Sequence, residues 1–423
     1  MSGWRMVRLG DVIEAKYGKA LPQPQRRGGD APVYGSNGVV GWHDTAITAA
    51  PVIVIGRKGS FGEVNFSNVP CWPIDTTYFI DDPGPYKMEF LEQLLRSLGL
   101  TRLDQSTAIP GLSRDQLYDI KVPVPSVREQ DKISELVGAV EEKRSSSLDH
   151  LSVARRVIER FRQAVLAAAC SGRLTADWRE GHPDAPSVEH ALTEMQQRRT
   201  RRGRREEVVD LELPELPGSY VIAPLGDSAT ILDYGTSRRS DATAENGIPV
   251  LRMGNIQDGQ LDLADLKYMS VDREVESLLL QSGDLLFNRT NSPELVGKSA
   301  VYYGTEPMTF ASYLIRVRFN PEVALPQYVN FWIDSAWGRL WAHHVKTDGV
   351  SQSNINGTKL ARLPLPLPPV EEQREIVRRA SELLTTADRL LGQVERAARS
   401  VKRSTQAVLA KTFRGELVPT EAE

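Results

Sequence analysis

The chain has 423 residues, 40% of them hydrophobic and 25% charged, a composition that fits a soluble protein of two or three domains. Its formal net charge of −3 excludes a protein that holds nucleic acid by bulk charge alone, so any DNA-binding site must be a local patch. The absence of a signal-peptide pattern and of a long apolar run predicts a cytoplasmic protein. Two cysteines, Cys71 and Cys170, exclude a disulfide framework and are expected to be buried thiols.

Residues 1–118 are predicted to form a mixed α/β domain of short strands. The apolar run Pro51-Val-Ile-Val-Ile55 fits a buried strand and is too short for a buried helix. It ends at Gly56-Arg-Lys-Gly-Ser-Phe-Gly62, a glycine-rich loop with two adjacent cations. Further strands are expected near 32–35 and 75–80, and a helix over 89–98.

A long helix of about 40 residues is predicted within residues 119–176. Prolines precede it, as is typical of a helix start. Apolar or small residues recur in alternating steps of four and three, which is a heptad seam. The seam consists of Ile133, Val137, Val140, Arg144, Ser147, Leu151, Ala154, Ile158, Phe161, Val165 and Ala168, and Arg144 and Ser147 are imperfect members.

Residues 177–217 are expected to be a polar basic linker, because the run 196–205 carries six arginines. A phosphate-contacting patch is the alternative interpretation, and a solvated linker or an exposed helix is the favoured one.

The second half of the chain repeats the first. A second domain over 218–364 carries 27 more residues than its counterpart, and a second long helix follows over 365–415. Val122-Pro-Val-Pro-Ser-Val-Arg-Glu-Gln130 returns 243 positions later as Leu365-Pro-Leu-Pro-Pro-Val-Glu-Glu-Gln373, and Gln163-Ala-Val-Leu-Ala167 returns at the same shift. The second seam, with imperfect members Ser404 and Lys411, therefore has the length of the first. An inserted residue would rotate the rest of a helix by about 100°, so this constancy favours helices.

These features predict an α+β protein with two α/β domains of short strands, each followed by a long helix, and the two helices pairing as an antiparallel coiled coil. The helices have kept a constant length while the domains have diverged. Such an arrangement fits two different recognition domains held at a fixed spacing. Duplex DNA has a regular helical repeat and is therefore the partner that this spacing favours.

The sequence lacks a recognisable catalytic constellation. Val296-Gly-Lys-Ser299 resembles the end of a phosphate-binding loop, but Ser292 stands where the pattern requires glycine. The six histidines form no convincing metal set, and the Asn/Asp-Pro-Pro-aromatic signature of adenine methyltransferases is absent.

The polar loops supply the candidate DNA-binding residues. Arginine and lysine can donate to guanine, asparagine can pair with adenine, and serine can hold phosphate. The candidates are Tyr17, Lys19, Ser36, Asn37, Arg57, Lys58 and Ser60 in the first domain, and Tyr234, Arg252, Asn255, Arg289, Asn291 and Lys298 in the second. For each, a turn residue or a surface charge is the alternative. The pair Arg57-Lys58 and Arg289 rank first, because they follow buried-strand patterns at matching places.

Several motifs together resemble the specificity subunit of type I restriction-modification systems. They are Pro32-Val-Tyr-Gly-Ser-Asn-Gly38, Ile55-Gly-Arg-Lys-Gly-Ser60, Trp72-Pro-Ile-Asp-Thr-Thr-Tyr78, the run 122–130 and Ile248-Pro-Val-Leu-Arg-Met-Gly-Asn-Ile256. The resemblance implies two target-recognition domains, one for each half of a split, asymmetric target in double-stranded DNA, and helices that set the gap. It implies no catalytic centre and no cofactor in this chain.

The resemblance also implies partners. Two methyltransferase subunits would use S-adenosylmethionine to methylate adenine, and two restriction subunits would use ATP and Mg²⁺. The helices, with Gln130 and Gln373 near their starts, would be the docking surface for the methyltransferases. A protein-binding scaffold, favoured by the near-neutral charge, and an enzyme that fuses recognition with methylation are the rival hypotheses.

Overall fold

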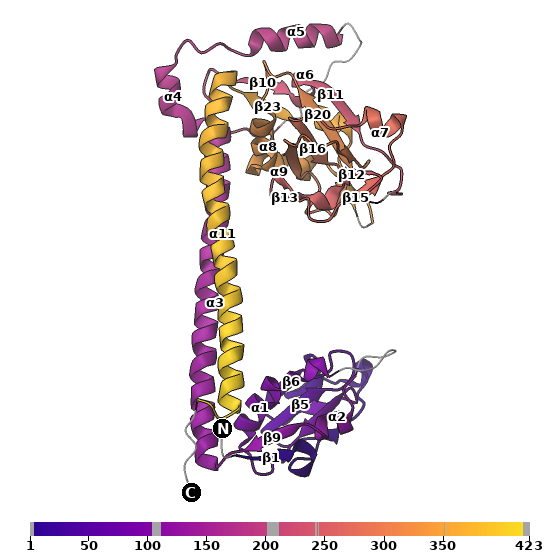
Figure 1. Ribbon diagram of the computed structural model, residues 1–423, viewed down its shortest axis with the longest axis vertical. Coiled ribbons are helices and arrows are strands. Elements are labelled where there is room, and N and C mark those ends of the chain that lie inside the picture. Colours follow the sequence, from indigo (N-terminus) through magenta and orange to yellow (C-terminus); the bar gives the residue numbers. More distant parts are fainter. Residues whose placement is uncertain are drawn as a thin grey trace. The chain divides into compact units, whose positions relative to one another are not determined.

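The computed structural model describes residues 4–103, 111–200, 211–241, 243, 245–350 and 352–417. Its contacts divide the chain into two compact units, Met1–Ala154 with Gln393–Glu423, and Arg155–Gly392. Each unit holds one mixed α/β domain and a segment of each of two long helices (Figure 1). The predicted α+β fold is therefore confirmed.

The two long helices are α3 (Val127–Cys170) and α11 (Val370–Phe413), each of 44 residues. Both bounds of α11 lie 243 positions after those of α3, so the constant shift seen in the sequence is a constant helix length. In the first unit, Ile133 and Val137 near the start of α3 share a core with Phe413 at the end of α11. The second unit joins the end of α3 to the start of α11 in the same way. The helices therefore pair antiparallel, as predicted.

The predicted seam is buried or half-buried along most of both helices. It is wrong at four positions, whose side chains are exposed: Phe161 of the first seam, and Leu390, Ser404 and Lys411 of the second, which lie 243 positions after Ser147, Phe161 and Ala168. Thr405 and Thr412, one residue further along, are buried in place of the last two. A straight helix drifts by about 20° per heptad against a strict seven-residue repeat, so the buried stripe moves off the predicted positions towards the helix end.

The described residues of the first domain form three small sheets. Their strand orders are β2-β8-β5-β6, β4-β3-β7 and β1-β9. The strands are β1 (Arg5–Arg8), β2 (Lys16–Tyr17), β3 (Ala31–Gly35), β4 (Gly38–His43), β5 (Val52–Gly56), β6 (Val64–Ser67), β7 (Trp72–Pro73), β8 (Thr77–Ile80) and β9 (Lys121–Val124). The helices are α1 (Met88–Ser97) and α2 (Arg114–Tyr118). The strands expected near 32–35, 51–55 and 75–80 and the helix over 89–98 are thus confirmed within two residues.

The second domain repeats this topology with the orders β11-β20-β16-β18, β15-β12-β19 and β10-β23. Its strands in these sheets are β10 (Val221–Pro224), β11 (Ala229–Tyr234), β12 (Ile248–Leu251), β15 (Lys267–Met269), β16 (Asp284–Asn288), β18 (Ser299–Tyr302), β19 (Thr309–Phe310), β20 (Leu314–Phe319) and β23 (Pro364–Leu367). Its helices are α6 (Leu225–Ser228), α7 (Arg273–Ser277), α8 (Pro326–Asp334), α9 (Ala336–Val345) and α10 (Gly357–Ala361).

Two small sheets occur in the second domain alone among the described residues. They are the hairpin of β13 (Ile256–Gln257) with β14 (Gln260–Leu261), and a sheet of β17 (Thr290–Asn291), β22 (Ser353–Asn354) and β21 (Thr347–Asp348). In the first domain a single bridge between Lys58 and Gly111 takes the place of the Thr290–Asn354 pairing. The additional residues of the second domain therefore extend a shared framework without changing it.

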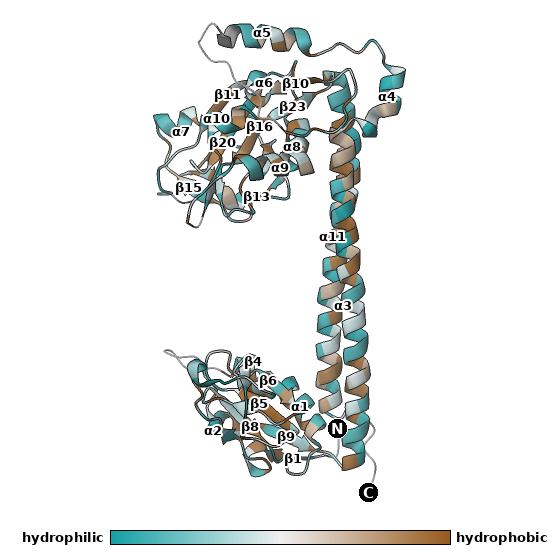
Figure 2. Ribbon diagram, turned by 180° about the vertical axis from the view of Figure 1, so that it is seen from behind, coloured by the Kyte–Doolittle hydropathy of each residue, from teal (hydrophilic) through white to brown (hydrophobic). Residues whose placement is uncertain are grey.

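The central strands of both domains are buried on both faces. All residues of β5 and β16 are buried, and Figure 2 shows the central strands largely in the brown of hydrophobic residues. In the second domain α8 packs on this sheet, with Tyr328 and Trp332 in the core. The continuous apolar run at residues 51–55 is the signature of such a doubly covered strand.

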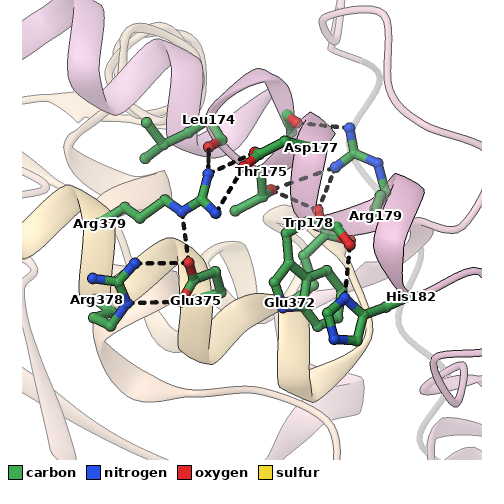
Figure 3. Close-up of polar contacts among 11 residues, drawn as sticks. Leu174, Thr175, Asp177, Trp178, Arg179, His182, Glu372, Glu375, Arg378 and Arg379 are labelled. Atoms are coloured by element: carbon green, nitrogen blue, oxygen red, sulfur yellow. Dashed lines mark hydrogen bonds and ion pairs between the residues drawn. The ribbon is translucent and has the colours of Figure 1, made fainter.

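The segment after α3 turns back onto the start of α11 and fixes the two helices together (Figure 3). The carboxylate of Glu372 is fully buried and accepts hydrogen bonds from Thr175 Oγ1 at 2.7 Å and from Tyr220 OH at 3.1 Å. Arg179 forms an ion pair with the same carboxylate. Arg379 binds Asp177 at 2.6 Å, which lowers the pKa of that carboxyl group.

The predicted linker region contains two helices in its described part, α4 (Ala176–Gly181) and α5 (Glu189–Thr200). Val188 and Leu192 are buried against the core of the second unit. The basic run at 196–205 lies outside the described residues from position 201 onward.

Candidate nucleic-acid interface

Two arginines occupy the same place in the two domains, directly after the central strands β5 and β16. Arg57 N donates to Thr76 O at 2.9 Å, and Arg289 N donates to Tyr313 O at 2.9 Å. Each guanidinium then donates to the preceding carbonyl, Arg57 to Asp75 O at 3.1 Å and Arg289 to Ser312 O at 3.2 Å. The same backbone contacts therefore hold both side chains, although the surrounding residues differ.

Each guanidinium also lies over a tyrosine ring. Arg57 Cζ is 5.0 Å from the ring centroid of Tyr17, and Arg289 Cζ is 4.9 Å from that of Tyr234. The glycine after each tyrosine is required, because a Cβ at Gly18 would lie 2.0 Å from Ile74 O and one at Gly235 would lie 2.2 Å from Phe310 O. A cation over an aromatic face keeps its charge while its orientation is fixed.

The other predicted residues of the first domain gather around Arg57. Ser36 Oγ donates to Thr76 O at 2.7 Å and Lys58 N donates to the same carbonyl at 3.2 Å. Ser60 and Ser36 both border Gly56, where a Cβ would lie 2.3 and 2.7 Å from their carbonyl oxygens.

Lys19 and Asn37 are both exposed, and Lys19 lies in the loop that follows β2. Lys19 O accepts from Trp72 Nε1 at 2.8 Å, and Asn37 lies in the turn between β3 and β4. Six of the seven predicted residues of the first domain therefore belong to adjoining loops, and Tyr17 ends the strand β2 beside them.

Sequence reasoning missed Arg114, whose Cζ lies 5.0 Å from the Tyr17 ring centroid. Ser113 and Gln116 form a capping box that starts α2 at Arg114, and this signal was readable in the sequence. Its proximity to Tyr17 depends on the tertiary fold and was not readable. Within the described ranges, no carboxylate forms an ion pair with Lys19, Arg57, Lys58 or Arg114. We call Lys19, Arg57, Lys58, Arg114 and Tyr17 the first loop cluster.

The second domain has a smaller cluster, built from Tyr234 and Arg289. Gly357, which corresponds to Arg114 at the 243 shift, donates its N–H to Tyr234 OH at 2.7 Å. Asn354 was also missed; its Oδ1 accepts from Arg289 Nη2 at 3.4 Å and its Nδ2 donates to Thr290 Oγ1 at 2.8 Å.

The remaining predicted residues of the second domain are engaged elsewhere. Asn255 is buried and its amide donates to Asp262 O at 2.8 Å and Asp265 O at 3.0 Å. Arg252 pairs with Asp265 at 3.0 Å. The two others also have partners within the domain: Asn291 Oδ1 accepts from Ser292 N at 2.8 Å, and Lys298 Nζ donates to Gln257 Oε1 at 3.2 Å.

Gln130 and Gln373 are fully buried and hold each domain to its helix. Gln373 Oε1 accepts from Leu325 N at 2.8 Å, and its Nε2 donates to Val323 O and Pro368 O at 2.8 and 2.9 Å. Gln130 makes the same three bonds, with Lys87 N at 2.7 Å and with Pro85 O and Pro125 O at 3.0 Å. These side chains form matching joints inside the protein.

Neither an ion site nor a membrane span is found in the described part of the chain. No group of three or more His, Cys, Asp and Glu side chains there could hold a metal ion. None of the helices described is both long and apolar enough to cross a membrane.

Two domains of one topology, each with an arginine stacked on a tyrosine and each joined to an equal helix, define a duplicated protein with two recognition heads. The family model described as the type I restriction modification DNA specificity domain matches residues 1–147 and 217–396. The chain belongs to this family.

Two similar proteins are specificity subunits of type I restriction enzymes. The type I restriction enzyme EcoKI specificity subunit of Escherichia coli (strain K12) is 30% identical over 303 residues, covering 70% of this chain and 58% of that protein. The EcoDI specificity subunit of Escherichia coli is 25% identical over 422 residues, covering 98% and 88%. The chain thus spans less than two thirds of the EcoKI subunit, but most of the EcoDI subunit.

A solved structure shows the same fold. The chain from a study of complex assembly and conformational transition of the type I R-M system is 18% identical, with a TM-score of 0.69 over 98% of both chains.

Proposed function

We propose that this chain is the DNA sequence-recognition subunit of a type I restriction-modification complex. Each domain binds one half of a split, asymmetric target in double-stranded DNA, and the chain directs adenine N6 methylation or cleavage by its partners. The observation that carries the proposal is the arginine stacked on tyrosine at the same place in both domains.

The first loop cluster supports binding of a phosphate or a base edge. Arg57 and Arg114 lie over the same tyrosine ring, and no carboxylate of the described residues neutralises them. Two cations held at one ring favour an anionic partner, and arginine can donate two hydrogen bonds to guanine. In the second domain, Arg289 carries this role alone.

Membership of the family supports a proposal for the partners. Two methyltransferase subunits that bind S-adenosylmethionine and two restriction subunits that use ATP and Mg²⁺ complete the complex, while this chain is non-catalytic and needs no cofactor. Cytoplasmic DNA is then the substrate.

The test uses the full chain assembled with its methyltransferase subunit. The target is first identified by mapping N6-methyladenine with the gene intact and deleted. Arg57→Ala should then weaken binding at one half-site and Arg289→Ala at the other, each by about 1 to 3 kcal/mol. Arg96→Ala, which removes a cation of α1 already paired with Glu92 and outside the candidate residues, is the matched control.

Salt titration separates this proposal from a protein-binding scaffold. Phosphate contacts make affinity fall steeply as salt rises. An unchanged methylation map together with salt-independent binding of a protein partner would reject DNA recognition.

A further inference from the structure

The second domain inserts the hairpin β13–β14 where the first domain joins β3 to β4 by the turn at Ser36 and Asn37. Its turn consists of Asp258 and Gly259, both with positive φ, 50° and 79°. This is the two-residue turn that matches the twist of paired strands.

The hairpin contacts both long helices within the second unit. Arg162 of α3 donates from Nη2 to Asp258 O at 3.4 Å, and Gln260 Nε2 donates to Asp388 Oδ2 of α11 at 3.3 Å. Arg162 and Asp388 form an ion pair with each other. The β13–β14 hairpin is therefore hydrogen-bonded to both members of an ion pair that joins the two helices. The Arg162 side chain is only 18% exposed in this contact.

The other side of the hairpin is tied to the central sheet. Asn330 of α8 is buried; its Nδ2 donates to Gly259 O at 2.9 Å and its Oδ1 accepts from Ser299 Oγ at 2.7 Å. Ser299 begins β18, which pairs with β16, the strand that ends before Arg289. A continuous path of hydrogen bonds thus joins the helix pair to the strand that carries the candidate recognition arginine.

We propose that the β13–β14 hairpin is a brace that fixes the angle of the second recognition domain against the helix pair, with Arg162 and Asp388 as positioning residues. The proposal rests on the proposed function, because the angle matters through the DNA spacing that it sets. The joint at Gln373 attaches the domain at the start of α11, and Asp388 lies 15 residues further along the same helix, about 22 Å away. Two separated attachments prevent the rotation that one alone permits.

The first experiment measures the angle without DNA. Spin labels are placed at exposed positions by Glu276→Cys on α7 and Arg389→Cys on α11 in the full chain, whose native cysteines are buried. Arg162→Ala should broaden the distance distribution between the labels. The exchange Arg162→Asp with Asp388→Arg should restore a narrow distribution. Arg399→Ala, which removes an exposed pair with Glu395 on α11, is the control.

The second experiment measures the consequence for recognition. The complex with the methyltransferase subunit is given DNA in which both half-sites are intact and the gap is natural or one base pair shorter or longer. Arg162→Ala should reduce the preference for the natural gap by about three- to tenfold, as expected for loss of a partly buried ion pair.

The outcomes are distinguishable. An unbroadened distribution in Arg162→Ala would overturn the brace, and a broadened one with unchanged gap preference would overturn the positioning role. If the wild-type complex recognises no split target, the proposed function is wrong. The distance distribution between the spin labels still tests the brace, because that measurement does not depend on DNA.

Discussion

The two buried glutamines offer a sharp test of how the domains are joined to the helices. In Gln373→Met the side chain keeps its length but loses three hydrogen bonds, leaving Leu325 N–H and the carbonyls of Val323 and Pro368 without their partner. An unsatisfied buried group costs about 1 to 3 kcal/mol, so the loss of three partners should lower the local stability by about 3 to 9 kcal/mol. Gln373→Glu should keep only the bond from Leu325 N–H.

Amide hydrogen exchange reads this loss directly. The Leu325 amide should exchange faster in Gln373→Met, while Gln130→Met should leave it unchanged and accelerate the Lys87 amide of the other unit. Gln393→Met, at an exposed position of α11, is the matched control. Wild-type exchange at Leu325 in Gln373→Met, or equal effects of both variants on both amides, would refute the reasoning.

Three further changes test other contacts. Phe413→Ala removes a ring 5.8 Å from that of Phe90 and should destabilise the first unit by about 3 to 5 kcal/mol, measured by denaturant unfolding. Gly259→Ala should cost about 1 to 3 kcal/mol in the second unit by the same assay, because its φ is 79° and a Cβ would lie 2.5 Å from Asp334 Oδ2. Burial raises the pKa of Asp334 from 3.8 to about 6, so the stability that its protonated form contributes is present below pH 3.8 and is lost as pH rises through 6. Asp334→Asn should remove up to about 3 kcal/mol of this pH dependence. An unchanged slope of unfolding free energy against pH in this variant would contradict the assignment.

The repeat in the sequence predicted the fold because it recorded a geometric constraint. An insertion in a helix rotates every residue beyond it, so the two copies of the helix kept the same length. The constant shift between Gln130 and Gln373 therefore indicated where both long helices lie. The seam failed at Ser404 and Lys411 because an ideal heptad ignores the drift of a straight helix.

The arrangement of the candidate residues was predictable only where a local pattern marked it. Arg57 and Arg289 follow apolar runs that had to be central strands, and the structure places them alike. Arg114 comes to Tyr17 from a distant part of the chain, so its proximity depends on packing that periodicity does not encode. Asn255 carries an amide suited to adenine, but residue type cannot reveal that the amide is bonded to Asp262 O and Asp265 O.

The first unit is built from both ends of the chain, and this sets an order for folding during synthesis. Residues 155–392, which form the second unit, leave the ribosome as one continuous stretch. The first domain is translated earlier, but the core that contains Phe90 and Val137 is complete only after Phe413 has been synthesised and has packed against them. Until then an apolar surface stays open to chaperones or to other nascent chains. The half of the protein that is made first is the last to complete its core.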